Sequence, residues 1–201
     1  SMNEELYNRQ EPLNLKQVKS AIVVGLGGTG SWVAFYLADS GCPELHLMDG
    51  DKLEVVNFNR LYIPIQGNLG RQKTEAIGEY LKTLRPDCSI QTYGKATKFS
   101  LLEINGGDTL FDCTDSEEVQ QMLYKWAKEN NRRYIRSGYD GTHITVVDRV
   151  PSWSVGEKAT GYEIRPSWVV PASISAAFAV SKAMYCPDTD IRADLNEFIK
   201  A

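Results

Sequence analysis

The sequence predicts an α/β fold of the Rossmann-like, doubly wound class, with a mainly parallel sheet and antiparallel strands toward its C-terminal end. Two observations support this fold class. Short apolar runs alternate with helical segments through the first two-thirds of the 201 residues, which is the order of a parallel sheet covered by helices. The first run, residues 21–24, leads directly into a glycine-rich loop and a helical segment, an order typical of nucleotide-binding units.

Each expected element follows from a local pattern. Residues 21–24 form an apolar run that ends in glycine, which is typical of a buried parallel strand. Residues 72–84 carry apolar side chains at helical spacing, and Pro86 stops that helix. The other strands are expected over residues 45–48, 89–93, 109–113, 134–137 and 143–147. The other helices are expected over residues 31–39, 117–129, 172–185 and 191–200, and an irregular stretch over residues 52–69.

The length of the chain suits one domain with a well-buried core. We expect an N-terminal arm over residues 1–13 and a single nucleotide-binding domain over residues 14–201, because no internal repeat or low-complexity segment divides the chain. The arm is polar and is expected to pack on the domain. A short helix is expected over residues 13–20.

Composition excludes several classes of partner. The net charge of −4 argues against nucleic acid as a ligand, because proteins that bind nucleic acid usually carry a basic face. No run approaches the roughly 18 apolar residues that span a bilayer, so no membrane partner is expected. The four cysteines form no C-x-x-C pair, which predicts no zinc site and reduced thiols. The acidic residues after Met2 resemble no signal peptide, and we expect a cytoplasmic protein.

The strongest local motif is a glycine loop between the first strand and the first helix. Gly25, Gly27, Gly28 and Gly30 lie in the sequence Gly-Leu-Gly-Gly-Thr-Gly-Ser, which fits the G-x-G-x-x-G pattern. Glycines allow close approach of the backbone to phosphate, and the helix N-terminus adds free N–H groups. Asp49 ends the second strand, where a carboxylate can accept hydrogen bonds from ribose hydroxyls. The motif predicts nucleotide binding, and by itself fits an NAD-dependent oxidoreductase as well as an ATP-binding enzyme.

A second group of polar residues favours ATP over NAD. Asp51, Asn57, Arg60 and Lys73 follow the second strand, and Asp115 follows the fourth strand of the chain. Arginine and lysine near phosphates stabilise the charge that develops when a carboxylate attacks the α-phosphorus and pyrophosphate leaves. Asp115 could cap the next helix or hold Mg²⁺, which takes one or two carboxylates beside phosphate oxygens. Hydride transfer has no need of so many cations around such a carboxylate.

Taken together, these residues resemble the ThiF/MoeB/HesA superfamily, whose fold is shared with ubiquitin-activating enzymes. The resemblance covers roughly residues 7–185 and includes the glycine loop, an N-x-x-R element and a D-x-x-D strand end. It also includes an arm similar to the R-Y-x-R-Q pattern at residues 7–10. The residues that match are Gly25 to Ser31, Asp49, Asn57, Arg60, Lys73 and Asp115.

The resemblance implies a role for each matching residue. It assigns Asp49 to the ribose, and Asp51, which follows the same strand, is also expected to bind the nucleotide. It assigns the ribose and phosphates to Asn57, Arg60 and Lys73, and the Mg²⁺ ion to Asp115. The residues expected to be catalytic are Arg9, Arg60, Lys73 and Asp115.

The implied activity is ATP-dependent adenylation of the C-terminal carboxylate of a small ubiquitin-like or sulfur-carrier protein. Arg9 would act on the phosphates of a partner subunit, which implies a homodimer. The chain departs from many members of the superfamily because the loop expected between Val147 and Trp168 holds no cysteine, so adenylation without a resident catalytic cysteine is expected. The alternatives are a non-catalytic ATP-binding scaffold, a subunit that works with another chain, and an NAD-dependent oxidoreductase.

Overall fold

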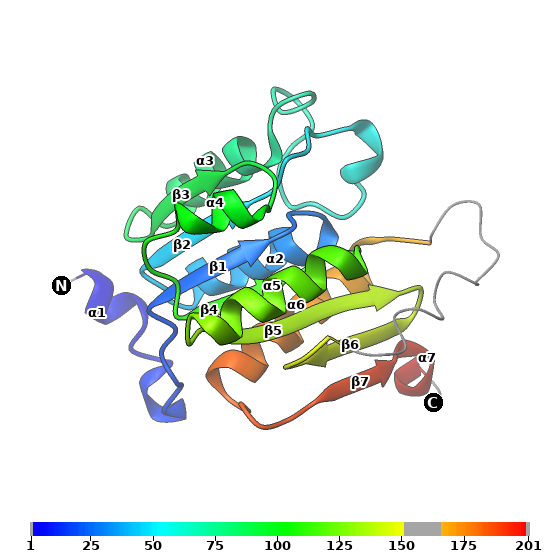
Figure 1. Cartoon of the computed structure of the whole chain (residues 1–201). Helices are drawn as coiled ribbons and strands as arrows, with labels where there is room; N and C mark the ends of the chain where they lie inside the picture. Colours follow the sequence, from blue (N-terminus) through cyan, green and yellow to red (C-terminus); the bar gives the residue numbers. More distant parts are fainter. Residues whose placement is uncertain (1, 151–165, 200–201) are drawn as a thin grey trace.

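The computed structural model describes residues 2–150 and 166–199, and within them a seven-stranded mixed sheet runs through the centre (Figure 1). The strands are β1 (Ser20–Val24), β2 (Glu44–Met48), β3 (Ser89–Tyr93), β4 (Thr109–Asp112), β5 (Arg133–Asp140), β6 (His143–Val147) and β7 (Ile191–Asp194). Their order is β3-β2-β1-β4-β5-β6-β7. The five strands from β3 to β5 in this order pair in parallel, whereas β6 and β7 pair antiparallel. The predicted fold class is therefore confirmed.

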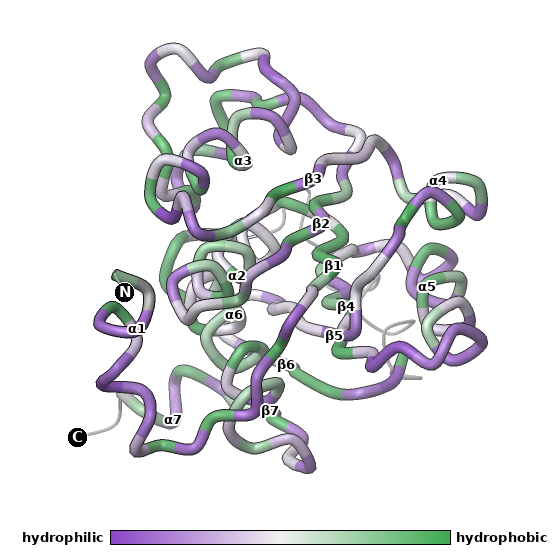
Figure 2. Tube along the Cα trace, turned by 90° about the vertical axis from the view of Figure 1, so that its left-hand side faces the viewer, coloured by the Kyte–Doolittle hydropathy of each residue, from purple (hydrophilic) through white to green (hydrophobic). Residues whose placement is uncertain are grey.

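Helices cover both faces of the sheet. They are α1 (Met2–Leu6), α2 (Gly28–Asp39), α3 (Lys73–Leu84), α4 (Lys98–Leu102), α5 (Glu117–Glu129), α6 (Val169–Met184) and α7 (Leu195–Ile199), with 3-10 turns η1 (Glu11–Leu13) and η2 (Val55–Asn57). Viewed from the side, α2, α3 and α6 lie on one face of the sheet, and α4 and α5 lie on the other (Figure 2). No helix in the described part of the chain is long and apolar enough to cross a bilayer.

The first strand is apolar throughout because it is covered from both sides. Ala21 and Val23 belong to the hydrophobic cluster under α2, α3 and α6, whereas Ile22 and Val24 belong to the cluster under α4 and α5. All four side chains are at most 1% exposed. The chain leaves β1 toward β2 on one side and returns to β4 on the other, so the strand order reverses at β1. Ligands of doubly wound sheets bind at such a point, outside the carboxyl ends of the strands.

Two predictions for secondary structure are wrong. Residues 13–20 do not form a helix: η1 ends at Leu13, and Asn14 adopts a left-handed conformation with φ of 50°. The Lys16 N–H then donates to Met184 O at 2.7 Å, which ties this segment to the end of α6. Residues 191–200 are not one helix, because Ile191–Asp194 pairs with the exposed edge of β6 before α7 begins. The short helices α1 and α4 were not predicted.

The N-terminal arm is docked on the end of the sheet that lies opposite the carboxyl ends of the parallel strands (Figure 1). The Tyr7 ring packs on Gly41, where an added Cβ would lie 3.3 Å from ring atoms. The Tyr7 hydroxyl donates to Asp87 Oδ2 at 2.7 Å, and Gln10 Nε2 donates to Ser40 O at 3.0 Å. The division into an arm and a single domain stays a prediction.

The docking of Tyr7 is expected to weaken at alkaline pH. Burial, together with the hydrogen bond to Asp87, raises the pKa of Tyr7 to about 12 from its ordinary value near 10. Because the folded-state pKa is raised, the stabilisation is fully present below about pH 10 and is lost as pH rises toward 12. The thermal midpoint of the wild type should exceed that of Tyr7→Phe at about pH 8, and the difference should shrink by about pH 11. A difference that stays constant over this range would show that Tyr7 does not dock through its neutral hydroxyl.

Candidate nucleotide-binding site

A cavity of about 670 Å³ opens at the carboxyl ends of β1, β2, β4 and β5. Its walls come from the glycine loop, from the segments that follow these strands, and from the residues just before α6. The sequence-predicted residues that line it are Gly25, Gly27, Gly28, Asp49, Asp51, Arg60, Lys73 and Asp115. The structure therefore brings these residues together around one cavity, while their roles stay predictions.

The glycine loop places backbone N–H groups at the cavity. Gly25 has φ of +84°, and an added Cβ there would lie 2.8 Å from Cys113 O. At Gly30 an added Cβ would lie 1.6 Å from Gly25 O, so this glycine lets the first turn of α2 contact the loop. Gly27 precedes α2 and supplies no side-chain cap. The first-turn N–H groups and the positive end of the helix dipole are therefore available to an anion.

The Asp49 carboxylate accepts a hydrogen bond from the glycine loop. Its Oδ2 accepts from the Leu26 N–H at 2.7 Å, and its Oδ1 accepts from the Asp51 N–H at 2.8 Å. Each carboxylate oxygen keeps a second lone pair, so the predicted contact with ribose hydroxyls remains possible. Asp49 thus has a structural function in addition to its predicted one.

Arg60 and Lys73 provide positive charge from two sides of the cavity. Arg60 Nη1 donates to Val56 O at 2.9 Å and to Asn59 Oδ1 at 2.8 Å. Lys73 is the first residue of α3 and is 9% exposed, with its Nζ 3.8 Å from Asp51 Oδ2. A buried cation at a helix N-terminus is opposed by the helix dipole. This unfavourable placement is explained if an anionic ligand binds beside it.

Two predicted residues lie elsewhere. Asn57 ends η2, and its Oδ1 accepts from the Glu54 N–H at 2.8 Å, so its amide caps this turn. Arg9 is exposed on the docked arm, at the other end of the sheet. Neither is among the described residues that line the cavity, and the roles predicted for them stay predictions.

The two aspartates at the end of β4 and just after it differ in their environment. Asp112 is fully buried, and its carboxylate accepts from the Tyr134 hydroxyl and from the N–H and hydroxyl of Thr114 at 3.0 and 2.7 Å. Asp115 is exposed and lines the cavity. Among residues 2–150 and 166–199, no three histidine, cysteine or acidic side chains are grouped to hold a metal ion. A single carboxylate still suits Mg²⁺ when phosphate oxygens and water complete its coordination.

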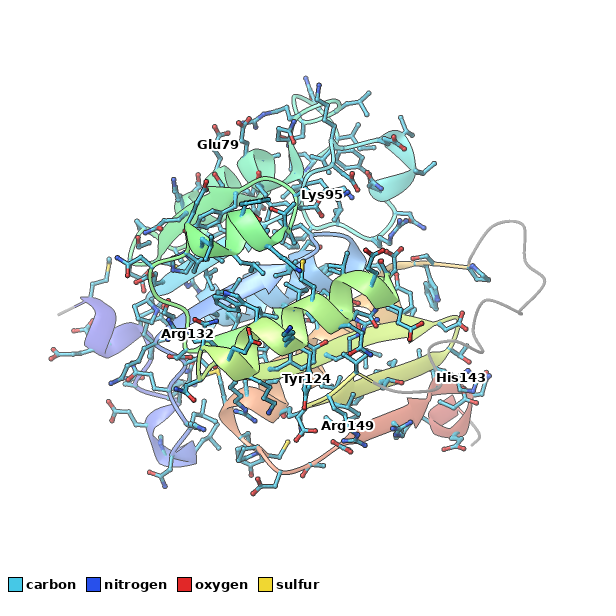
Figure 3. The ribbon with its side chains drawn as sticks, viewed as in Figure 1. Glu79, Lys95, Tyr124, Arg132, His143 and Arg149 are labelled. Carbon is cyan, nitrogen blue, oxygen red and sulfur yellow. The ribbon has the colours of Figure 1, made fainter. Side chains whose placement is uncertain are left out.

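Several residues that line the cavity were not predicted from the sequence, and three of them carry polar or charged groups at or after the strands. Arg136 lies midway along β5, and its Nη1 donates to Ser137 O at 2.6 Å and to Asp112 O at 3.1 Å. Lys95 follows β3 and lies beside Gly50, where an added Cβ would be 2.9 Å from Lys95 Cβ. Figure 3 shows Lys95 beyond the carboxyl end of β3. Tyr139 lines the cavity from the end of β5. All three lie in or after predicted strands, which is the signal that could have indicated them.

Burial works against a nucleophilic thiol at three of the four cysteines. Burial raises the pKa of Cys42 and of Cys88 to about 12, and it also raises the pKa of Cys113, which lines the cavity. A raised pKa disfavours the thiolate, the form that acts as a nucleophile. The loop expected between Val147 and Trp168 lies mostly outside the described residues, since these exclude 151–165.

Comparison with known proteins identifies relatives of this chain. The ThiF family model matches residues 4–156. The tRNA threonylcarbamoyladenosine dehydratase of Haemophilus influenzae is 32% identical over 151 residues, which are 71% of this chain and 58% of that protein. Adenylyltransferase and sulfurtransferase MOCS3 of Drosophila yakuba is 35% identical over 119 residues, which are 58% of this chain and 26% of that protein. The chain therefore spans less than two-thirds of the length of these relatives.

The solved structures confirm the fold. The structure of E. coli MccB with ATP matches with a TM-score of 0.70 at 21% identity, over 86% of this chain and 56% of that one. At this level of identity the likeness establishes the architecture of the chain.

Proposed function

Because the chain belongs to the ThiF family, we propose that it uses ATP to adenylate a carboxylate, the C-terminus of a small ubiquitin-like or sulfur-carrier protein. One observation carries this proposal. The glycine loop, two cations and an exposed carboxylate line a single cavity at the point where the strand order reverses: Gly25 to Gly28, Arg60, Lys73 and Asp115.

The geometry fits the chemistry of adenylation. A carboxylate oxygen attacks the α-phosphorus of ATP, the bond from that phosphorus to the bridging oxygen breaks, and pyrophosphate leaves with the electron pair. The N–H groups at the start of α2 can bind phosphate oxygens. Arg60 and Lys73 lower the repulsion between the two anions and stabilise the charge on pyrophosphate. These side chains lie in a partly enclosed cavity, where such interactions are stronger than in bulk water.

Asp115 is the residue that would hold Mg²⁺. It is exposed in the cavity, whereas the Asp49 carboxylate accepts two backbone N–H groups and the Asp51 carboxylate lies 3.8 Å from Lys73 Nζ. When bound, Mg²⁺ supplies neutralising charge to the phosphate oxygens.

The relatives support the same activity. MOCS3 is named an adenylyltransferase, and MccB has been solved with ATP. The homodimer is part of the proposal because the arm that includes Arg9 lies at the end of the sheet opposite the carboxyl ends of the parallel strands (Figure 1). Arg9 would therefore reach phosphates only in a partner subunit.

A second candidate substrate follows from the dehydratase of H. influenzae, whose name specifies a modified adenosine in tRNA. Dehydration at a carboxylate can proceed through the same activation by ATP, since adenylation turns the carboxylate oxygen into a leaving group. The net charge of −4 favours the protein substrate over the tRNA. Pyrophosphate exchange that depends on a carrier protein, or on tRNA, would separate the two.

The first test is calorimetry with ATP and Mg²⁺, and separately with NAD. ATP is expected to bind in a manner that depends on Mg²⁺, and NAD is not expected to bind. Asp115→Ala should remove most of the dependence on Mg²⁺, because the variant lacks the carboxylate that would hold the ion. Asp188→Ala is the matched control, since Asp188 is exposed in the turn between α6 and β7. Binding of NAD without ATP would overturn the proposal.

A further inference from the structure

Ser167, just before α6, is hydrogen-bonded to the segment after η2 and to β5. Asn59 Nδ2 donates to Ser167 O at 2.8 Å, and the hydroxyls of Tyr139 and Ser167 form a short hydrogen bond. Asn59 Oδ1 also accepts from Arg60 Nη1 at 2.8 Å. A continuous series of contacts thus runs from Arg60 through Asn59 and Ser167 to Tyr139. We call the last three residues the Asn59–Ser167–Tyr139 bridge.

The two ends of this series meet at the glycine loop. An added Cβ at Gly28 would lie 3.0 Å from Arg60 Cδ and 3.0 Å from the Tyr139 hydroxyl oxygen. Gly28 is the first residue of α2, so both groups lie beside the positive end of this helix. Arg60, Ser167 and Tyr139 all line the cavity. The bridge is therefore a wall of the cavity next to the N–H groups that can bind phosphate.

The bridge has one hydroxyl proton that its own hydrogen bonds do not use. Tyr139 and Ser167 carry one hydroxyl proton each, and their mutual hydrogen bond uses only one of them. Within the described residues, neither hydroxyl makes another hydrogen bond, and Arg60 donates through Nη1 alone. One O–H and two guanidinium nitrogens therefore remain for a ligand. Donors of this kind beside a helix N-terminus suit an anion with several oxygens.

We propose that the Asn59–Ser167–Tyr139 bridge binds the part of the nucleotide that leaves as pyrophosphate. Tyr139, held by the Ser167 hydroxyl, donates its proton in a hydrogen bond to a phosphate oxygen. Asn59 is a positioning residue that holds the Arg60 guanidinium toward the same anion. The identification of the anion as pyrophosphate rests on the proposed adenylation, whereas the preference for a polyphosphate rests on the donors themselves.

The test uses the full chain and inorganic pyrophosphate with Mg²⁺, measured by calorimetry. Tyr139→Phe removes one O–H and keeps the ring, and its affinity for pyrophosphate is expected to fall about tenfold or more, as for a lost hydrogen bond to a charged group. Ser167→Ala should give a smaller loss, because Tyr139 keeps its own proton. Tyr185→Phe is the matched control, since Tyr185 is 65% exposed after the end of α6. This control should bind like the wild type.

Positioning by Asn59 has its own readout. With Asn59→Ala the guanidinium loses the side-chain oxygen that holds it, so the dependence of pyrophosphate affinity on salt should decrease. Tyr139→Phe removes no charge and should keep the salt dependence of the wild type. An Asn59→Ala variant that weakens binding but keeps the full salt dependence would contradict the positioning of Arg60.

Each remaining outcome decides one of the two proposals. If the wild type does not bind pyrophosphate, or if Tyr139→Phe binds it equally well, the bridge is not a phosphate-binding wall. If the wild type and Tyr139→Phe bind pyrophosphate with the expected affinities but no substrate supports pyrophosphate exchange, the phosphate-binding role of the bridge is supported and the proposed adenylation is contradicted. If thermal melting shows that Tyr139→Phe does not fold, Ser167→Ala decides, and wild-type affinity in that variant would overturn the proposal.

Discussion

Replacing Lys73 by methionine is expected to slow substrate-dependent pyrophosphate exchange by about 10²–10³-fold, the range found when one donor to a developing negative charge is removed. Lys73 lines the cavity on the first turn of α3, with only 9% of its surface exposed. Its charge acts in a partly enclosed site, so water cannot replace it well. Methionine keeps an unbranched side chain of similar length, and the packing of the stem is retained.

The same substitution should leave stability unchanged or raise it slightly. The Lys73 ammonium lies at the positive end of α3, and its nearest acidic partner is Asp51 at 3.8 Å, which is 80% exposed. Removing a cation from such a position relieves an unfavourable interaction with the helix dipole. A gain in thermal midpoint combined with a loss of exchange would show that the lysine is retained for the reaction.

Lys125→Met is the matched control, because Lys125 is 76% exposed on α5 and pairs with Glu129 at 3.8 Å. It makes the same change in net charge and should affect exchange little, as expected for an exposed ion pair. If Lys73→Met retains the exchange rate of the control, Lys73 does not contact the phosphates, and the proposed catalytic set loses a member.

The parts of the fold that could be predicted from sequence are those encoded by adjacent residues. The apolar run of β1, the glycine loop and α2 follow each other along the chain, so their pattern predicts both the elements and the place of the ligand. Strand β7 could not be predicted in this way. Its four residues become a strand because they pair with β6, which lies far earlier in the chain, and this pairing overrides local preference.

The residues of the candidate site likewise differ in whether the local sequence could predict them. Arg60 and Lys73 could be predicted because they follow β2, whose carboxyl end faces the cavity. Ser167 could not, since it reaches Asn59 only through the fold, across more than a hundred residues of sequence. Arg136 was missed because an arginine within a short strand gives no sign of whether its side chain will reach the strand end.

Two substitutions in the glycine loop are expected to separate its structural role from its role in ligand binding. Gly30→Ala is expected to destabilise the protein by about 3 kcal/mol or more, at or above the upper end of overpacking substitutions. An added Cβ would lie 1.6 Å from the Gly25 carbonyl oxygen, and the two nearest atoms belong to the Gly25 backbone, which cannot move without separating α2 from the loop. Chemical denaturation would measure the loss directly.

Gly27→Ala is the counterpart within the same loop, and its effect is expected on the ligand alone. An added Cβ at Gly27 meets no atom within 4 Å, and the residue has a negative φ of −77°, so alanine would not need a left-handed backbone there. The stability of this variant should therefore stay close to that of the wild type. Gly27 itself lines the cavity, so the new methyl group would occupy space that the phosphate needs. It should therefore hinder the approach of phosphate to the N-terminus of α2. Wild-type affinity for ATP and pyrophosphate in Gly27→Ala would mean that the phosphates do not bind at this loop, and that the cations of the cavity serve another anion.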